Sequence, residues 1–383
     1  MSSFTKVYWR STGVPAWGLI FLIIIAIAAL LAAEKLQKRN PIVEQNYSTM
    51  ITAATTMRQA MDVIKPIRAG MEPINPVTDP QRSGLVGISN SIVTSNHGGK
   101  TSKQTTVNPN WAAVAVKLMA EAGVQKGDRV AVTVSGSFPA INLAVYSAIE
   151  AIGAKPVIIA SATSSQWGAN VPGLLWIDMS RKLREKGILH HKETAVSLGA
   201  IEDRGVGIDD QGIESVKRSI NRVGTEFLYP RNYQEAVAKR IAIFREAAEG
   251  EKYKAFINVG GGATIVGPPG IDDQFHNGLI YDASSRAFAV DTVMGYFLQE
   301  GIPGIHFINI KNLADEYGLP IAPAEPVAVG NGGIYSASSY RRWLAAVLGL
   351  ALFGMTWLIV RSARITSVWR RSHDHNKSVR PMV

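Results

Sequence analysis

Three short loops carry residue types suited to binding an anion or a carbonyl group. They are SGSFP (135–139), SQWGAN (165–170) and NVGGG (258–262). Glycines allow close approach to the backbone, and successive free N–H groups form nests that receive anions. Serine, glutamine and asparagine add neutral hydrogen-bonding groups. The loops predict a site for a carboxylate or phosphate, although each loop taken alone is also consistent with a simple turn.

The candidate ligand-binding residues are small or polar, with one cation. They are Lys103, Ser135, Gly136, Ser137, Ser165, Asn170, Asn258, Gly260, Gly261 and Gly262. A serine at a strand-to-helix turn also suggests a nucleophile, although the GxSxG pattern does not fit here. In that hypothesis Ser137 attacks, NVGGG forms the oxyanion hole, and Asp178 or a histidine assists. The sequence does not choose among the candidate bases His97, His190, His191, His276 and His306.

Nucleotide and metal sites are disfavoured. Neither GxGxxG nor the P-loop pattern occurs, and the adenylate-forming enzymes that residues 123–132 resemble have a phosphate loop that is missing here. His190 and His191 are adjacent and therefore diverge, whereas the cluster of Asp272, Asp273 and His276 lies beside GPPG in a loop. We therefore expect no metal and no cofactor.

The elements around the first two loops form a βαβ pattern. Residues 129–134 are β-branched and end at a Ser-Gly turn, which predicts a buried strand. Ser137 occupies an expected helix N-cap, Gly153 an expected C-cap, and residues 156–160 a second strand. Parallel strands present their carboxyl ends at one edge, where ligands bind in open α/β sheets.

Strands and helices alternate along the rest of the chain, which predicts an α/β fold. We expect a mainly parallel, Rossmann-like sheet with helices on both faces. The further predicted segments are a strand and exposed loop within 81–108, a helix from Trp111, a segment at 173–184, helices at 213–222 and 233–248, and strands at 255–259, 305–310 and 322–329.

Two uncharged apolar segments, at 15–33 and 343–360, are each close to the roughly 20 residues that span a bilayer. A cleaved signal peptide is the alternative for the first, but its apolar stretch is longer than usual. Two spans divide the chain into a cytoplasmic N-terminal tail (1–14), a juxtamembrane helix and linker (34–80), an extracytoplasmic domain (81–338) and a basic cytoplasmic tail (361–383).

The formal net charge of +10 comes mainly from the two tails. Residues 361–383 contain six lysines and arginines against one aspartate, so the positive-inside rule places the C-terminus in the cytoplasm. This distribution gives no reason to expect nucleic acid as a partner.

Apolar residues recur four and three apart over residues 43–64, as in the seam of a coiled coil. The pattern predicts either a homo-oligomer through this segment or packing on the chain's own domain. Pro66 and the proline-rich segment 74–80 are expected to end the helix.

Several stretches resemble the poly-γ-glutamate system protein family. They are KQTTVNPNWAA (103–113), SGSFPAIN (135–142), SQWGAN with Pro172 (165–172), WIDM (176–179), SLG (197–199) and FINVGGG (256–262). The resemblance extends over about residues 80–330 and includes both flanking spans. Loop 200–210 (AIEDRGVGIDD) has fewer glycines than in that family.

The resemblance implies a two-pass protein of the cytoplasmic membrane that works with other membrane subunits in capsule-type polymer synthesis or export. We expect an accessory component that binds poly-γ-glutamate, or its glutamyl end, through the three loops. One alternative is an extracytoplasmic amide-bond hydrolase or transferase that trims or releases the polymer. The other is a non-catalytic scaffold.

Overall fold

The computed structural model describes residues 16–36, 38–40, 46–335, 337–339 and 341–376. The chain divides into two compact units. One comprises Val43–Tyr335, and the other joins the segments Met1–Ile42 and Ser336–Val383. The predicted N-terminal tail (1–14) and the first residues of the seam lie outside the described residues.

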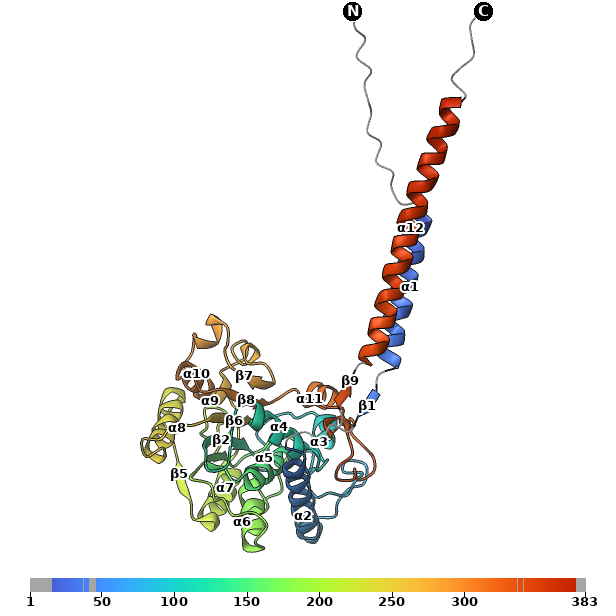
Figure 1. The fold of residues 1–383 in the computed structure, drawn as a ribbon. Helices are drawn as coiled ribbons and strands as arrows, with labels where there is room; N and C mark the ends of the chain where they lie inside the picture. Colours follow the sequence, from blue (N-terminus) through green and yellow to red (C-terminus); the bar gives the residue numbers. More distant parts are fainter. Residues whose placement is uncertain (1–15, 37, 41–45, 336, 340, 377–383) are drawn as a thin grey trace, which may run out of the picture. The chain divides into compact units, whose positions relative to one another are not determined.

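A seven-stranded sheet forms the centre of the unit Val43–Tyr335 (Figure 1). Its strand order is β5-β4-β3-β2-β6-β8-β7, and every pair is parallel except β7 with β8. The strands are β2 (Arg129–Ser135), β3 (Lys155–Ser161), β4 (Ala195–Ser197), β5 (Glu226–Leu228), β6 (Ala255–Val259), β7 (Gly278–Ile280) and β8 (Gly304–Phe307). The mostly parallel sheet confirms the predicted α/β class.

Helices cover both faces of this sheet. They are α2 (Tyr47–Met71), α3 (Lys100–Thr106), α4 (Trp111–Glu121), α5 (Pro139–Ile152), α6 (Trp176–Glu185), α7 (Asp210–Val223), α8 (Tyr233–Ala247), α9 (Ala263–Val266), α10 (Val293–Gln299) and α11 (Ile310–Glu316). Along β2, Val130 and Val132 join the hydrophobic cluster of α2, α4 and α5, whereas Ala131 joins the cluster of α8 and α10. This alternation follows from the period of two in a strand.

The predicted βαβ unit is present as β2, α5 and β3. Gly153 caps α5 in the left-handed conformation, with φ of 75°, and donates to the carbonyl of Ile149. The predicted N-cap is wrong. Phe138 holds that position, because Pro139 begins the helix, and the Ser137 hydroxyl instead accepts a hydrogen bond from the Ser165 N–H at 3.1 Å.

Two predicted strands do not form. Residues 81–99 are loops with one isolated bridge, Thr94 to Ser164, and helix α3 follows. Residues 322–329 are also irregular. Neither segment reaches the sheet, whose edges are β5 and β7.

Helix α2 belongs to the sheet-containing unit, so the predicted boundary near residue 81 is wrong. Met50, Met57 and Ile64 are at most 1% exposed and lie in the cluster with α4 and α5. The apolar face is therefore covered within one chain and is not free to pair with a second copy. Pro66 does not end the helix, which continues to Met71.

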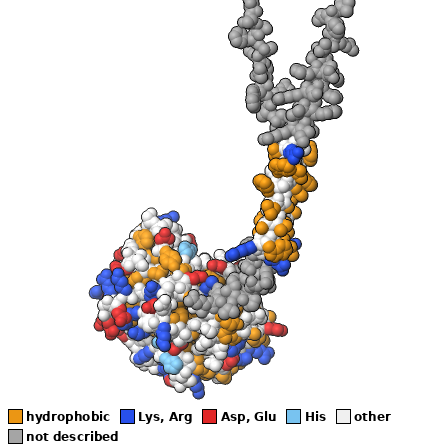
Figure 2. All heavy atoms as spheres, in the orientation of Figure 1, with side chains coloured by type: hydrophobic (Ala, Val, Ile, Leu, Met, Phe, Trp, Pro, Cys, Tyr) orange, Lys and Arg blue, Asp and Glu red, His pale blue; other side chains and the backbone are white. Residues whose placement is uncertain are grey.

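The other unit contains two long helices that contact each other, α1 (Ala16–Lys35) and α12 (Arg342–Asn376) (Figure 1). Strand β1 (Lys38–Asn40) pairs antiparallel with β9 (Ala337–Ser339). By length and composition, Ala16–Lys35 and Arg342–Ser362 could each cross a membrane. Large apolar side chains on them are exposed, including Trp17 at 67% and Phe353 at 73%, as the orange surface in Figure 2 shows.

Candidate functional site

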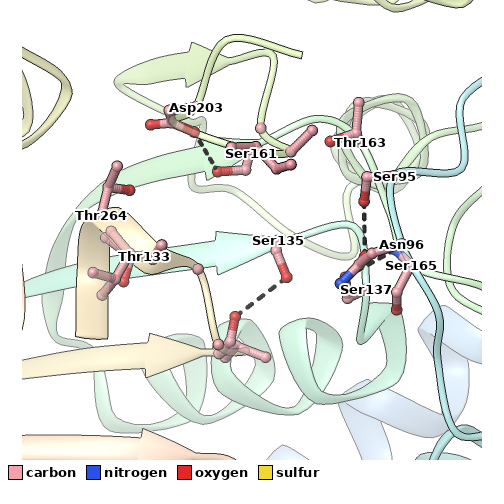
Figure 3. A pocket seen from close by; sticks show the side chains of 18 of the residues that line it. Ser95, Asn96, Thr133, Ser135, Ser137, Ser161, Thr163, Ser165, Asp203 and Thr264 are labelled. Carbon is pink, nitrogen blue, oxygen red and sulfur yellow. Dashed lines mark hydrogen bonds between the residues drawn. The ribbon is translucent and has the colours of Figure 1, made fainter. Parts of the chain in front are cut away.

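The predicted loops meet around one cavity of about 890 Å³ at the carboxyl ends of β2, β3 and β6 (Figure 3). Helices α8 and α9 contribute Arg240 and Thr264 to its wall, and the loop after β4 contributes Asp203. The convergence follows from topology, because parallel strands end at one edge. The cavity is within the size range of small-molecule sites, roughly 300–1,000 Å³.

Most of the predicted ligand-binding residues line this cavity. They are Lys103, Ser135, Ser137, Ser165, Asn258, Gly261 and Gly262. Further hydroxyl groups come from Ser95, Ser102, Thr133, Ser161, Thr163 and Thr264. The wall is therefore rich in neutral groups that both donate and accept hydrogen bonds.

Gly136, Asn170 and Gly260 support the site without lining it. Asn170 is fully buried, and its side-chain amide bonds to both the N–H and the carbonyl of Ile88 at 2.9 and 2.8 Å. A Cβ at Gly136 would lie 2.8 Å from the carbonyl oxygen of Thr163. Gly260 has φ of 102°, and a Cβ there would lie 2.8 Å from the Ser135 hydroxyl. Asn170 therefore links two loops by hydrogen bonds, and the two glycines allow neighbouring loops to approach closely.

Lys103 supplies a buried cation at the cavity wall, with a side chain only 2% exposed. Its Nζ donates to the carbonyl of Ser137 and to Ser165 Oγ at 2.9 Å, and it lies 3.6 Å from the ring centroid of Phe138. Among the described residues, no carboxylate contacts the Lys103 amine. Burial lowers the pKa of Lys103 from 10.5 to about 7, because desolvation disfavours the ammonium.

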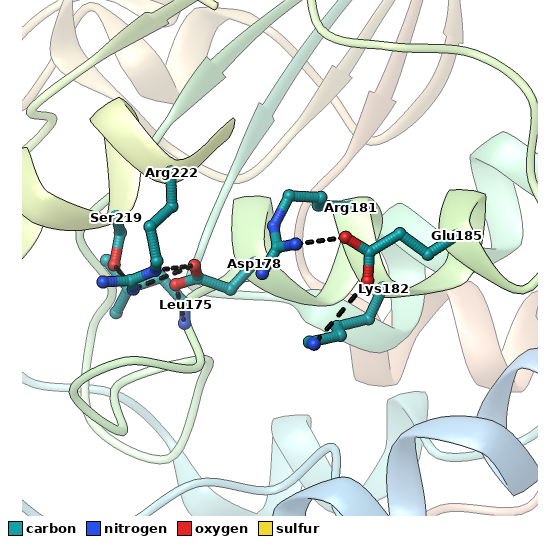
Figure 4. Close-up of polar contacts among 7 residues, drawn as sticks. All are labelled: Leu175, Asp178, Arg181, Lys182, Glu185, Ser219 and Arg222. Carbon is teal, nitrogen blue, oxygen red and sulfur yellow. Dashed lines mark hydrogen bonds and ion pairs between the residues drawn. The ribbon is translucent and has the colours of Figure 1, made fainter. Parts of the chain in front are cut away.

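Asp178 does not line the cavity, so its predicted role beside Ser137 is wrong. It contacts Leu175 and Arg222 instead (Figure 4). The side chain is buried at the start of α6, where it accepts from the N–H of Leu175 at 3.0 Å and pairs with Arg222 at 2.9 Å. A carboxylate in the first turn caps a helix and interacts favourably with its dipole. This stabilising role accounts for its position in WIDM.

The candidate histidines are dispersed. His97 lines the cavity and contacts Gln166, whereas His190 and His191 pair with Glu150 elsewhere. His276 is exposed and contacts the carbonyl of Asn277. Across the described residues, no three His, Cys, Asp or Glu side chains gather in a group that could hold a metal ion.

His306 ends a buried polar row across three adjacent strands. The Thr133 hydroxyl donates to Asn258 Oδ1 at 2.8 Å, and Asn258 Nδ2 lies 3.1 Å from His306 Nδ1. Burial lowers the pKa of His306 to about 4, so this ring is neutral at physiological pH. The row extends from the cavity wall into the sheet.

Sequence reasoning missed the buried pair of Asp203 and Arg240. Both side chains line the cavity, at 3% and 1% exposure, and Arg240 Nε donates to Asp203 Oδ2 at 2.6 Å. A signal was available for the arginine. Arg240 lies three residues after Val237 and four before Phe244, on the apolar stripe of α8, where an arginine needs a buried partner.

The comparisons give no family assignment. No family model matches the chain, and no curated protein matches it. Among solved structures, an archaeal alanine:glyoxylate aminotransferase is similar at 10% identity over 76% of this chain and 58% of that chain. The TM-score of 0.15 is too low for this similarity to support an argument.

Proposed function

We propose that this protein is a membrane-anchored accessory component of a poly-γ-glutamate synthesis or export system, and that its cavity binds a short glutamyl segment or the polymer end. The observation that carries the proposal is Lys103, a buried cation at the cavity wall whose contacts include no carboxylate in the described part of the chain. A carboxylate ligand would complete an ion pair in a site shielded from water, where charge attraction is strong.

The rest of the wall suits the repeating unit of such a polymer. Each γ-linked glutamate carries one free carboxylate and one amide. Hydroxyl groups such as those of Ser135 and Ser137 can donate to an amide carbonyl and accept from its N–H. The residue resemblance in the three loops points to the same polymer, and the cavity volume suits a short segment.

The proposed location is the cytoplasmic membrane, with two spans, the sheet-containing unit outside and both termini in the cytoplasm. Exposed apolar side chains on α1 and α12 support the spans. The excess of basic residues in 361–383 supports the orientation. Other membrane subunits of the system are the proposed protein partners.

Polymer binding by the full-length protein in detergent tests this proposal. We expect calorimetric titration with γ-glutamyl oligomers to show binding, and Lys103→Met to weaken it by at least roughly tenfold, as the loss of a charge-assisted contact does. Lys100→Met is a matched control on the same helix, because the Lys100 side chain is exposed and does not line the cavity.

Absence of binding by the wild-type protein, or equal effects of the two lysine substitutions, would contradict the carboxylate site. If the wild type fails to bind but the protein is still needed for polymer production in cells, a non-catalytic scaffold becomes the better description.

A second candidate function, an amide-bond hydrolase or transferase, is favoured by one contact. Ser165 Oγ lies 2.9 Å from Lys103 Nζ, and with a pKa of about 7 this amine is partly neutral at physiological pH. A neutral amine can accept the hydroxyl proton as Ser165 attacks an amide carbon, and can return it to the leaving nitrogen. In this candidate function, Ser165 and Lys103 take the roles predicted from the sequence for Ser137 and Asp178.

A further inference from the structure

The Asp203 carboxylate is bound as a ligand would be. Arg240 Nε donates to Oδ2 at 2.6 Å, Arg240 Nη2 pairs with the same oxygen at 2.5 Å, and the Ser197 hydroxyl donates to Oδ1 at 2.6 Å. Ser161 Oγ lies 3.2 Å from Oδ1 (Figure 3). Arg240 Nη2 also reaches Ser161 Oγ and Ser197 Oγ, at 3.0 and 2.9 Å. One guanidinium and two hydroxyls thus surround a single carboxylate.

The three donor residues are fixed by regular elements. Ser161 and Ser197 are paired in register at the ends of β3 and β4. Arg240 projects from the middle of α8 and is 1% exposed. Sites built on strands and helices keep their geometry better than sites built on loops.

Asp203, by contrast, comes from a loop with an unfavourable backbone. Ala200, Glu202 and Asp203 have φ of 62°, 55° and 64°, in the left-handed region that residues other than glycine seldom adopt. Such strain persists only where surrounding contacts enforce it, and it clusters at switch regions. The same loop exposes Ile201 at 61%. The donor set is therefore rigid, while the group it holds is attached to a strained segment.

We propose that Arg240, Ser161 and Ser197 form a second carboxylate-binding subsite, and that Asp203 occupies it until a ligand carboxylate displaces it. The inference rests on the proposed polycarboxylate ligand. Ligand and aspartate carboxylates make the same bonds, so the exchange preserves the ion pair and lets loop 199–206 leave its strained conformation. A polymer with one carboxylate per residue would then contact Lys103 and Arg240 together, because both line the cavity.

Acetate titration of an Asp203→Gly variant tests the subsite directly. Glycine accepts φ of 64° and removes the carboxylate, which leaves the three donors without their anion. We expect acetate to raise the Tm of full-length Asp203→Gly in detergent, at concentrations that leave the wild type unchanged. Sodium chloride at the same ionic strength should have no such effect. Adding Arg240→Met to this variant should abolish the acetate effect.

Asp209→Ala is a second control, since Asp209 accepts from the N–H of Gly212 and caps α7, and no described arginine pairs with it. Its loss of stability should not respond to acetate. If acetate stabilises Asp203→Gly no more than it stabilises Asp209→Ala, the subsite does not exist. Because this assay contains no polymer, its result is independent of whether glutamyl oligomers bind.

Hydrogen exchange on the wild type tests the displacement, including the case in which Asp203→Gly fails to fold. The Gly205 N–H donates to the Gly199 carbonyl at 2.8 Å and reports on the closed loop. We expect γ-glutamyl oligomers to accelerate exchange at 199–206 while slowing it around Lys103. Slowing around Lys103 with unchanged or slower exchange in the loop would overturn the displacement and leave polymer binding intact.

Discussion

The amine of Lys103 and the hydroxyl of Ser165 lie 2.9 Å apart, within a cavity wall where neither side chain is more than 5% exposed. The two proposed functions therefore depend on the same pair of groups. As an ammonium, Lys103 attracts a carboxylate, and as a free amine it can take a proton from Ser165. Under these proposals, the protonation state of Lys103 determines whether the pair binds a carboxylate or activates Ser165.

Protonation of Lys103 makes ligand binding and stability respond to pH in opposite directions. Since burial lowers its pKa from 10.5 to about 7, the unfolded chain holds a proton between these values that the folded chain has released. The free energy of unfolding of the wild type should therefore rise from pH 7 to 10 relative to that of Lys103→Met. Carboxylate binding should weaken over the same range. Denaturation and titration at several pH values measure both, and parallel pH profiles for the two proteins would show that Lys103 does not titrate in this window.

Substitution of the two serines distinguishes catalysis from binding. If the protein cleaves or transfers γ-glutamyl amides, Ser165→Ala should lower the rate by a factor on the order of 10⁴ or more, as the loss of a nucleophile does. Ser137→Ala should lower the rate far less, because the Ser137 hydroxyl accepts from the Ser165 N–H and supplies a hydrogen bond without being the attacking group. Product length by size-exclusion chromatography measures this. Full activity of Ser165→Ala would rule out the Ser165–Lys103 mechanism.

Substitutions at Gly260 and Gly261 in the NVGGG loop should have different effects on stability and on ligand binding. Gly260→Ala places a side chain at φ of 102° and 2.8 Å from Ser135 Oγ, so we expect a loss of stability of about 1–3 kcal/mol. Gly261 lies at the cavity wall, and its Cβ would make an ordinary contact of 3.6 Å with Ile308. Gly261→Val should keep the fold and weaken ligand binding, as thermal unfolding and titration will show. Normal binding by Gly261→Val would mean that this loop is only a turn.

The buried apolar face of α2 should contribute to the stability of the sheet-containing unit. Met57 is fully buried, so Met57→Glu is expected to destabilise the sheet-containing unit by several kcal/mol, about what burial of an unpaired charge removes. Met71, on the same helix but 46% exposed, provides the control Met71→Glu. Urea denaturation and light scattering separate unfolding from dissociation. A folded Met57→Glu protein of halved mass would restore the coiled-coil hypothesis.

Cysteine labelling tests the orientation, since the chain contains no cysteine of its own. Lys252→Cys introduces a thiol at an exposed position of the sheet-containing unit, and Ser378→Cys introduces one in the basic tail. A membrane-impermeant reagent added to intact cells should label position 252 and spare position 378. The reverse pattern would place the unit in the cytoplasm and make nucleotides available to the cavity.

Local patterns predicted the centre of the fold well and its periphery poorly. The β-branched segments at 129–134 and 255–259 were recognisable because buried parallel strands are apolar on both faces. Strands β4, β5 and β7 have three residues each, too few to show a period. The apolar residues at 322–329 suggested a strand, but the edges of the sheet are formed by other segments.

The site was predictable only where topology imposes it. Parallel strands bring Ser135, Ser165 and Gly261 to one edge, and this consequence needs no knowledge of side-chain packing. The partnership of Asp203 with Arg240 spans 37 residues and depends on how α8 lies on the sheet. The predicted catalytic role of Asp178 was wrong because the sequence does not distinguish a carboxylate that caps a helix from one that acts in catalysis.

The polar row of Thr133, Asn258 and His306 has a consequence for assembly of the sheet. These residues are register partners on β2, β6 and β8, and their side chains satisfy one another at 2% exposure or less. Sliding one strand by a single residue would turn its polar side chain to the opposite face, among the valines and isoleucines packed on α4 and α5. A buried polar group without a partner is costly, so misaligned sheets are penalised and the native alignment is selected as the chain folds.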